Sequence, residues 1–344
     1  MPASAPHGGN PMKKLFVLAA VAAFFPNAAM AADGCADPIV YLVDGQGGNP
    51  NGNPGQGQTG ISTTTGCPAG LLFQGAATSL DLNDIAPEGA DRFGPEGDSD
   101  TIGGAFTYWG TTDQKGQRYD LHYQHARRVF SGSRARLVID LPINLSHADA
   151  FKPFKGAIPS GGTAIVGTVN VGLELPVEPN WVITPRVSYG VAAANAYFGG
   201  DFEQVSASVS SRYKISAGRG DLIIGNMVSY AHSVKIVTKQ FRYDKEQNWV
   251  FRNGLAYQLP LKSRMFGRQA SIRASYVFTN TAGDRLAYEQ IHEVGISIGV
   301  RSREAEQKSR FEQLRIGLLY THSNNRTYSK WGYDSGTLTL GYRF

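Results

Sequence analysis

Apolar and polar residues alternate with a period of two through most of the chain beyond residue 101. The stretch 333–344 shows the pattern most simply, because one face carries Leu338, Leu340, Tyr342 and Phe344 while the opposite face is polar. Successive side chains of a β-strand point to opposite sides of the sheet, so this pattern predicts strands with two different environments. An all-β fold follows from it.

We predict twelve such strands, each close to the ~9–11 residues that a tilted strand needs to cross a bilayer. Pro185 falls inside the fifth and cannot donate to a ladder, which predicts a local break or bulge. The predicted ranges are 102–109, 117–127, 134–141, 163–175, 180–192, 202–213, 220–231, 247–259, 269–280, 290–301, 311–321 and 333–344.

The predicted connections alternate in length. Residues 142–162, 232–247 and 322–332 make long links, whereas 176–179 makes a tight turn. Alternating long and short links are typical of an even-stranded transmembrane barrel. Lipid cannot satisfy an open sheet edge, so we expect the first strand to pair with the last in a closed antiparallel barrel.

The N-terminal residues carry an export pattern. Met12-Lys13-Lys14 is basic, residues 15–25 are apolar, and Ala29-Met30-Ala31 has the small-x-small pattern of a signal peptidase site. We therefore expect a cleaved signal peptide starting at Met12, with residues 1–11 as an upstream extension and Ala32 as the first mature residue. A lipid anchor on Cys35 is the less favoured reading, because an acid stands beside its cleavage site. No later stretch approaches the ~18 apolar residues of a membrane helix.

Residues 32–100 differ from the strand-rich part. A low-complexity tract, Gly45 to Gly60, is bracketed by the only two cysteines, Cys35 and Cys67. In an oxidising compartment a disulfide between them is the favoured prediction; metal binding is weaker, since no histidine or further cysteine lies nearby. Residues 69–82 could form a short helix, and the acidic stretch 81–100 reads as a linker.

Several charged residues take the strand face opposite the apolar one, together with Asn170. In lipid, a basic group at midplane would cost ~2–4 kcal/mol, so the sequence predicts that they line the lumen. A salt-bridge network and a conducting role fit them equally well. The predicted lumen charges are Asp140, Glu174, Arg186, Arg252, Arg273, Glu293, Arg315 and Arg343.

Catalytic patterns are weak. Residues 97–100 are similar to the start of a GDS-type esterase block but lack its leucine, and a polar turn explains them better. His122 falls on the lumen face of the second strand, with His125 nearby, yet no Asn or Ser partner stands at a recognisable spacing. We predict no catalytic residue, no metal site and no cofactor. The basic and aromatic loop 232–247 could meet lipopolysaccharide phosphates, although a solvated loop is the simpler reading.

The last strand resembles the closing strand of bacterial outer-membrane barrels, whose terminal aromatic is read by the barrel-assembly machinery. That resemblance implies an assembly signal at Leu340, Tyr342 and Phe344. The segment 174–190 resembles the strand–turn–strand repeats of autotransporter translocator barrels, and the likeness extends over about 101–344. Because only residues 32–100 precede the barrel, the chain resembles solitary autotransporter-type barrels without a large passenger.

The resemblance implies the Gram-negative outer membrane as location. The implied partners are its lipids and lipopolysaccharide, the assembly machinery and periplasmic chaperones. The net charge of +5 comes without a basic block, so nucleic acid is not an expected partner.

A structural or translocating barrel without catalysis is the leading function. A narrow diffusion channel, a barrel hydrolase and a soluble exported β-sandwich are the alternatives. We further expect the acidic end of residues 32–100 to sit in or under an arginine-lined pore as a plug.

Overall fold

The computed structural model describes residues 98–110, 115–129, 134–149, 161–194, 202–234, 236, 247–283, 290–300, 313–324 and 333–343. These residues form twelve strands. They are β1 (Ser99–Gly110), β2 (Lys115–Arg128), β3 (Arg136–Asp149), β4 (Gly161–Glu178), β5 (Trp181–Ala194), β6 (Phe202–Ala217), β7 (Gly220–Ser233), β8 (Gln247–Met265), β9 (Arg268–Gly283), β10 (Gln290–Val300), β11 (Gln313–Asn324) and β12 (Tyr333–Arg343). No helix in the described part of the chain is long and apolar enough to cross a bilayer.

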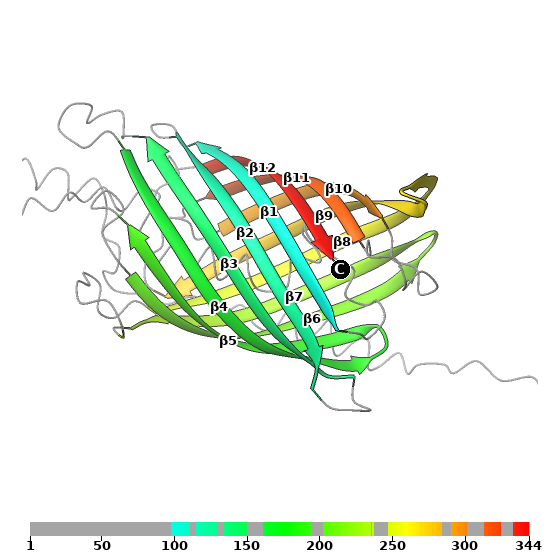
Figure 1. Cartoon of the computed structure of the whole chain (residues 1–344), viewed down its shortest axis with the longest axis horizontal. Coiled ribbons are helices and arrows are strands. Elements are labelled where there is room, and N and C mark those ends of the chain that lie inside the picture. The colour runs from blue at the N-terminus through cyan, green and yellow to red at the C-terminus, as the bar shows by residue number, and fades with distance from the viewer. Residues whose placement is uncertain are drawn as a thin grey trace, which may run out of the picture.

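Each strand pairs antiparallel with its sequence neighbours, and β1 pairs with β12 to close the barrel. The closing register runs from Thr101 opposite Arg343 to Gly110 opposite Asp334. Figure 1 shows cyan β1 beside red β12 in the barrel wall. We call the end where β1 begins and β12 ends the proximal end, and the opposite end the distal end. The predicted closed barrel and its twelve strands are confirmed.

The strands are tilted because the ladder is staggered. A row of paired residues that leaves β4 at Pro176 and follows the register around the barrel returns to β4 at Gly162, a stagger of 14 residues. With twelve strands about 4.8 Å apart, this stagger corresponds to a tilt of about 39° and a backbone radius of about 12 Å. The bore therefore has room for long side chains to meet inside the barrel.

The barrel is apolar outside and polar inside. On β12, Leu338 and Leu340 are half exposed on the outer wall, whereas Thr337 and Thr339 between them are buried. Polar and charged residues also outnumber apolar ones among the buried residues of the described strands as a whole. A soluble protein would place its apolar residues inside, so this distribution suits a barrel surrounded by lipid.

One part of the inner wall is apolar, which the sequence did not predict. Buried apolar side chains on β7, β8 and β9 form a continuous internal cluster. On β7 three consecutive residues, Leu222, Ile223 and Ile224, are apolar although they alternate between the two faces, so the period-two signal is lost there. The cluster consists of Ile223, Met227, Ala231, Val250, Ala256 and Val277.

Two prolines test the predicted boundaries. The prediction that the third strand stops at residue 141 is wrong, because β3 continues through Pro142 to Asp149. Pro142 keeps its register with β2, opposite His122, and only the ladder to β4 lapses there. Pro185 interrupts the ladder between β4 and β5 without shifting the register, so it makes a break and no bulge.

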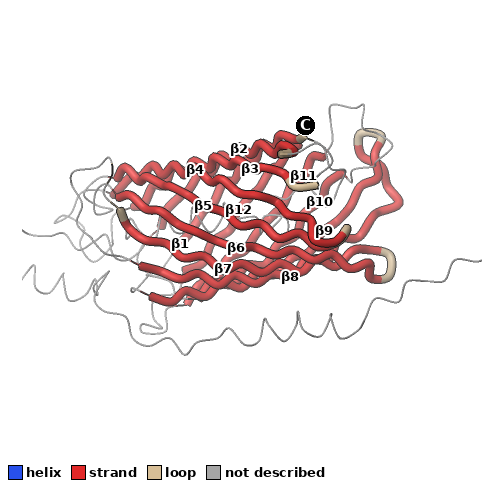
Figure 2. Tube along the Cα trace, turned by 90° about the horizontal axis from the view of Figure 1, so that it is seen from below, coloured by secondary structure: helices blue, strands red, loops and turns tan. Residues whose placement is uncertain are grey.

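The β8–β9 hairpin extends past the proximal rim, as Figures 1 and 2 show. Its turn residues, Phe266 and Gly267, have φ values of 52° and 75°. Two positive φ values in succession are typical of a type I′ turn, which follows the right-handed twist of a hairpin. A register shift lies between Pro260 and Arg264. Pro260, Lys262, Arg264 and this irregularity are features that discourage strand addition at a free edge.

Candidate functional site: the charged lumen

A buried carboxylate on β3 organises one side of the lumen. Asp140 is fully buried, and its Oδ1 contacts the His122 imidazole of β2 at hydrogen-bonding range. Its Oδ2 accepts from Asn170 Nδ2 of β4 at 3.0 Å and lies 3.6 Å from Arg186 Nη1 of β5. Four adjacent strands are therefore tied together by one carboxylate. Burial of this charge is tolerated because it is paired and hydrogen-bonded on both oxygens.

A second buried carboxylate bridges two arginines. Glu174 of β4 accepts from Arg136 Nε of β3 at 2.8 Å and from its Nη2 at 2.5 Å, on the same oxygen. Its other oxygen lies 3.3 Å from Arg212 Nη2 of β6. Arg136 and Glu174 face each other directly in the β3–β4 register, so one half of this triad is fixed by strand pairing.

The β8–β11 side of the lumen holds a third ion pair and two arginines bound to neutral groups. Arg252 Nη2 of β8 donates to Glu293 Oε2 of β10 at 2.6 Å, reaching past β9. Arg273 Nη2 donates to Gln258 Oε1 at 2.6 Å. Arg315 donates to two serine hydroxyls, Ser297 and Ser271, at 3.2 and 3.1 Å.

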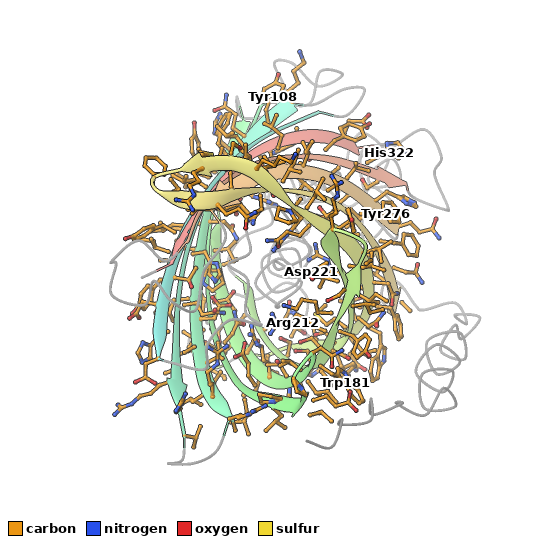
Figure 3. The ribbon with its side chains drawn as sticks, turned by 90° about the vertical axis from the view of Figure 1, so that its right-hand side faces the viewer. Tyr108, Trp181, Arg212, Asp221, Tyr276 and His322 are labelled. Atoms are coloured by element: carbon orange, nitrogen blue, oxygen red, sulfur yellow. The ribbon has the colours of Figure 1, made fainter. Side chains whose placement is uncertain are left out.

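The charge of the lumen is uneven along its axis. Four arginines lie near the proximal end. Arg136 is the first residue of β3, and Arg315 is the third residue of β11. Arg212 and Arg273 lie close to the proximal ends of β6 and β9. Among the described lumen residues at that level, the carboxylates are Glu174 and Asp221. Figure 3, viewed from the proximal end, shows Arg212 and Asp221 directed into the bore. The proximal half of the lumen is therefore a basic zone.

The distal half of the lumen wall carries fewer charges. Arg118 and Asp120 of β2 pair with each other at 2.9 Å. Buried amide and hydroxyl side chains stand near the distal ends of their strands, namely Gln204, Asn248 and Ser323. Trp109 of β1, which is 7% exposed, lies on the same inner face. An anionic chain would meet its strongest attraction at the proximal end.

The sequence-predicted site residues fall into three groups. Asp140, Glu174, Arg186, Arg252, Arg273, Glu293 and Arg315 are all less than 9% exposed and share the contacts above. The Arg343 side chain, Cys35, Cys67, Phe344 and the basic residues of the loop from 237 to 246 lie outside the described residues. Leu340 is 50% exposed on the outer wall, and Tyr342 lies two residues beyond it on the same face.

Several contributors were not singled out from the sequence, among them Arg136, Arg212 and Gln258. Arg212 continues the inward parity of Ser206, Ser208 and Ser210, so the alternation of β6 could have revealed it. Because the other inward residues of β6 named here are uncharged serines, this face was not predicted to line the lumen. The pairing of Arg212 with Glu174, two strands away, follows from barrel curvature and has no sequence signal.

The esterase-like segment has a structural role at the proximal end of the wall. Asp98 accepts from the Arg128 backbone N–H at 3.0 Å. Asp100 accepts from the Tyr123 hydroxyl at 2.7 Å and contacts His125 Nδ1 at 2.9 Å. These contacts fasten the start of β1 to the end of β2. Within the described ranges, no three His, Cys, Asp or Glu side chains group so as to hold a metal ion.

Closure, outward apolar residues and a charged lumen define the molecule as a transmembrane β-barrel. Its fold is that of autotransporter translocator domains. The β-domain of the Bordetella autotransporter BrkA superposes with a TM-score of 0.52 at 11% identity, covering 72% of this chain and 99% of that one. The translocator domain of NalP from Neisseria meningitidis gives 0.51 at 13% identity, covering 80% and 97%. No family model and no curated protein matches the sequence.

Proposed function

We propose that the barrel is a translocator-type conduit of the Gram-negative outer membrane and that its N-terminal region occupies or covers the basic zone. One observation carries the proposal: the proximal lumen concentrates Arg136, Arg212, Arg273 and Arg315 against few carboxylates. The acidic stretch 81–100 leads directly into β1, which begins at that same end. Opposite charge on a tethered segment gives a high effective concentration at the pore.

Conductance in planar bilayers tests this proposal. Deleting residues 32–97 leaves β1 intact, and we expect the single-channel conductance to rise several-fold. A matched deletion of residues 45–60 removes low-complexity sequence but keeps the acidic stretch, and it should leave the conductance unchanged. Equal conductance of the full chain and the 32–97 deletion would mean that this region does not close the pore.

A narrow diffusion channel is the second candidate. The observation that favours it is that each ion pair described above joins residues on nearby strands, not on opposite sides of the bore. Arg136 and Glu174 are on adjacent strands, and Arg252 and Glu293 are two strands apart. Charges paired along the wall leave the axis free for water. A full-length chain that already conducts at the level of the 32–97 deletion would support this reading.

We also propose the outer-membrane location and the absence of a catalytic step. The first is supported by the apolar outer wall, and the second by lumen carboxylates that are engaged by guanidinium groups. Membrane fractionation with a heat-modifiable shift on a gel tests the location. Release of fatty acid or peptide by the purified barrel, lost in His122→Ala, would contradict the non-catalytic assignment.

A further inference from the structure

The outer wall of the barrel carries an amide pair in the middle of its apolar band. Asn226 of β7 and Asn253 of β8 face each other directly in the register. The two side chains alternate with buried inward residues, so both point away from the lumen. Asn226 Nδ2 donates to Asn253 Oδ1 at 2.7 Å.

The depth of this pair follows from its neighbours on β8. Outward residues on either side of Asn253 are Phe251 and Leu255, and beyond them stand Trp249 and Tyr257. Each of these amphipathic aromatics is four positions from Asn253, about 13 Å along the strand. Trp and Tyr favour the two interfaces of a membrane, which places the amide near the midplane.

A third polar side chain extends the row. Ser211 of β6 faces Asn226 in the register, and its hydroxyl accepts from Trp181 Nε1 at 2.9 Å. Figure 3 places Trp181 on the β5 side of this wall. Next to the row on β6, Ala207 and Val209 are exposed and small or branched, so the surface stays shallow. We call Ser211, Asn226 and Asn253 the polar row.

The polar row has hydrogen-bonding capacity that lipid cannot use. Each amide offers two donors and two acceptor lone pairs, and the contact between Asn226 and Asn253 uses one donor and one oxygen. Acyl chains provide neither donors nor acceptors, so partly exposed amide groups at this depth are costly to leave facing lipid. Between transmembrane helices, small residues allow close approach and polar side chains hydrogen-bond across the contact, and the same physics applies to the outer wall of a barrel.

We propose that the outer face of β6–β8 is a self-association surface on which a second copy of this chain docks through the polar row. A second copy is the favoured occupant because an amide row is complementary to itself. The Asn253 N–H groups of one barrel can donate to the Asn226 carbonyl of the other. The same contact repeats in the opposite direction, from the second barrel to the first. A two-fold axis along the membrane normal brings the two rows to the same depth.

Disulfide cross-linking in lipid vesicles tests the proposal, in a background where Cys35 and Cys67 are changed to serine. Val228→Cys places a thiol beside Asn226 on the outer wall, where Val228 is 38% exposed. Leu338→Cys is the matched control, because Leu338 is equally outward and 51% exposed but lies on β12. We expect oxidation to give a covalent dimer with Val228→Cys and not with Leu338→Cys.

The role of the amides is tested by adding Asn226→Leu and Asn253→Leu to the Val228→Cys chain. Self-association should weaken about tenfold, whereas the heat-modifiable shift of the folded barrel should remain. Three results would overturn the proposal: no dimer with Val228→Cys, equal dimer with Leu338→Cys, or a dimer that survives both leucine substitutions. A cross-link from Val228→Cys to a different protein in cells would also overturn it.

Discussion

At the scale of single residues, the barrel depends on carboxylates that are buried with their partners. Glu174 holds two guanidinium groups, Arg136 and Arg212, at a level of the lumen where few other acids are described. The cost of burying an ion is offset only while its partner is present. Removing the shared partner therefore matters more than removing either arginine.

Glu174→Gln should destabilise the folded barrel by about 3–5 kcal/mol, because two buried guanidinium groups lose their carboxylate. The measurement is urea unfolding in detergent, followed by the heat-modifiable gel shift. Glu178→Gln is the matched control, since Glu178 is exposed near the β4–β5 turn. A similar small change in both variants would show that the triad contributes little.

At the scale of elements, the sequence predicts strands well where the two faces differ and poorly where they do not. β12 alternates cleanly, and the structure has a strand at every predicted position that it describes, from Tyr333 to Arg343. A proline usually ends a ladder, yet β3 continues through Pro142 and loses only the local pairing to β4. The apolar inner face of β7 was invisible because Leu222, Ile223 and Ile224 erase the alternation.

The candidate site shows the same division. The period-two alternation alone predicts which charged residues lie on the face opposite the apolar one, as for Arg273 and Arg315. It does not say which charges meet, because Arg252 reaches Glu293 past an intervening strand. That contact depends on curvature and stagger, which are properties of the closed barrel. The polar row was not predicted for a related reason. An asparagine among apolar residues weakens the alternation, and the sequence alone does not show that a second asparagine faces it on the next strand.

The β8–β9 turn offers a prediction about an element. Phe266 adopts a positive φ that costs an L-residue about 1–2 kcal/mol, and its side chain is 71% exposed. Asparagine is favoured at this position of a type I′ turn. Phe266→Asn should therefore raise the free energy of unfolding by about 1 kcal/mol, measured by urea titration. Phe266→Leu keeps the strain and should leave stability unchanged; an equal gain in both would assign the effect to lost apolar exposure.

At the scale of the whole molecule, the barrel has no free edge in its wall because β1 and β12 meet. The outer residues of that seam, Phe106 and Leu338, are 38% and 51% exposed. On the lumen side Thr107 faces Thr337, and their hydroxyl oxygens are 2.9 Å apart. The stagger of the strands and the contact of Arg252 with Glu293 past β9 both depend on the closed barrel, and therefore on this seam.

The seam is tested by a covalent bond across it. Cysteines at two directly paired positions lie within the distance that a disulfide spans, so Thr107→Cys with Thr337→Cys should oxidise without distorting the barrel. With Cys35 and Cys67 changed to serine, the oxidised chain should migrate faster than the reduced chain even after boiling, because its ends are linked. Thr107→Cys with Leu338→Cys is the control, since these side chains point to opposite sides of the wall. A disulfide in the control but not in the Thr107–Thr337 pair would place the seam one residue out of register and turn the faces of β12 inside out.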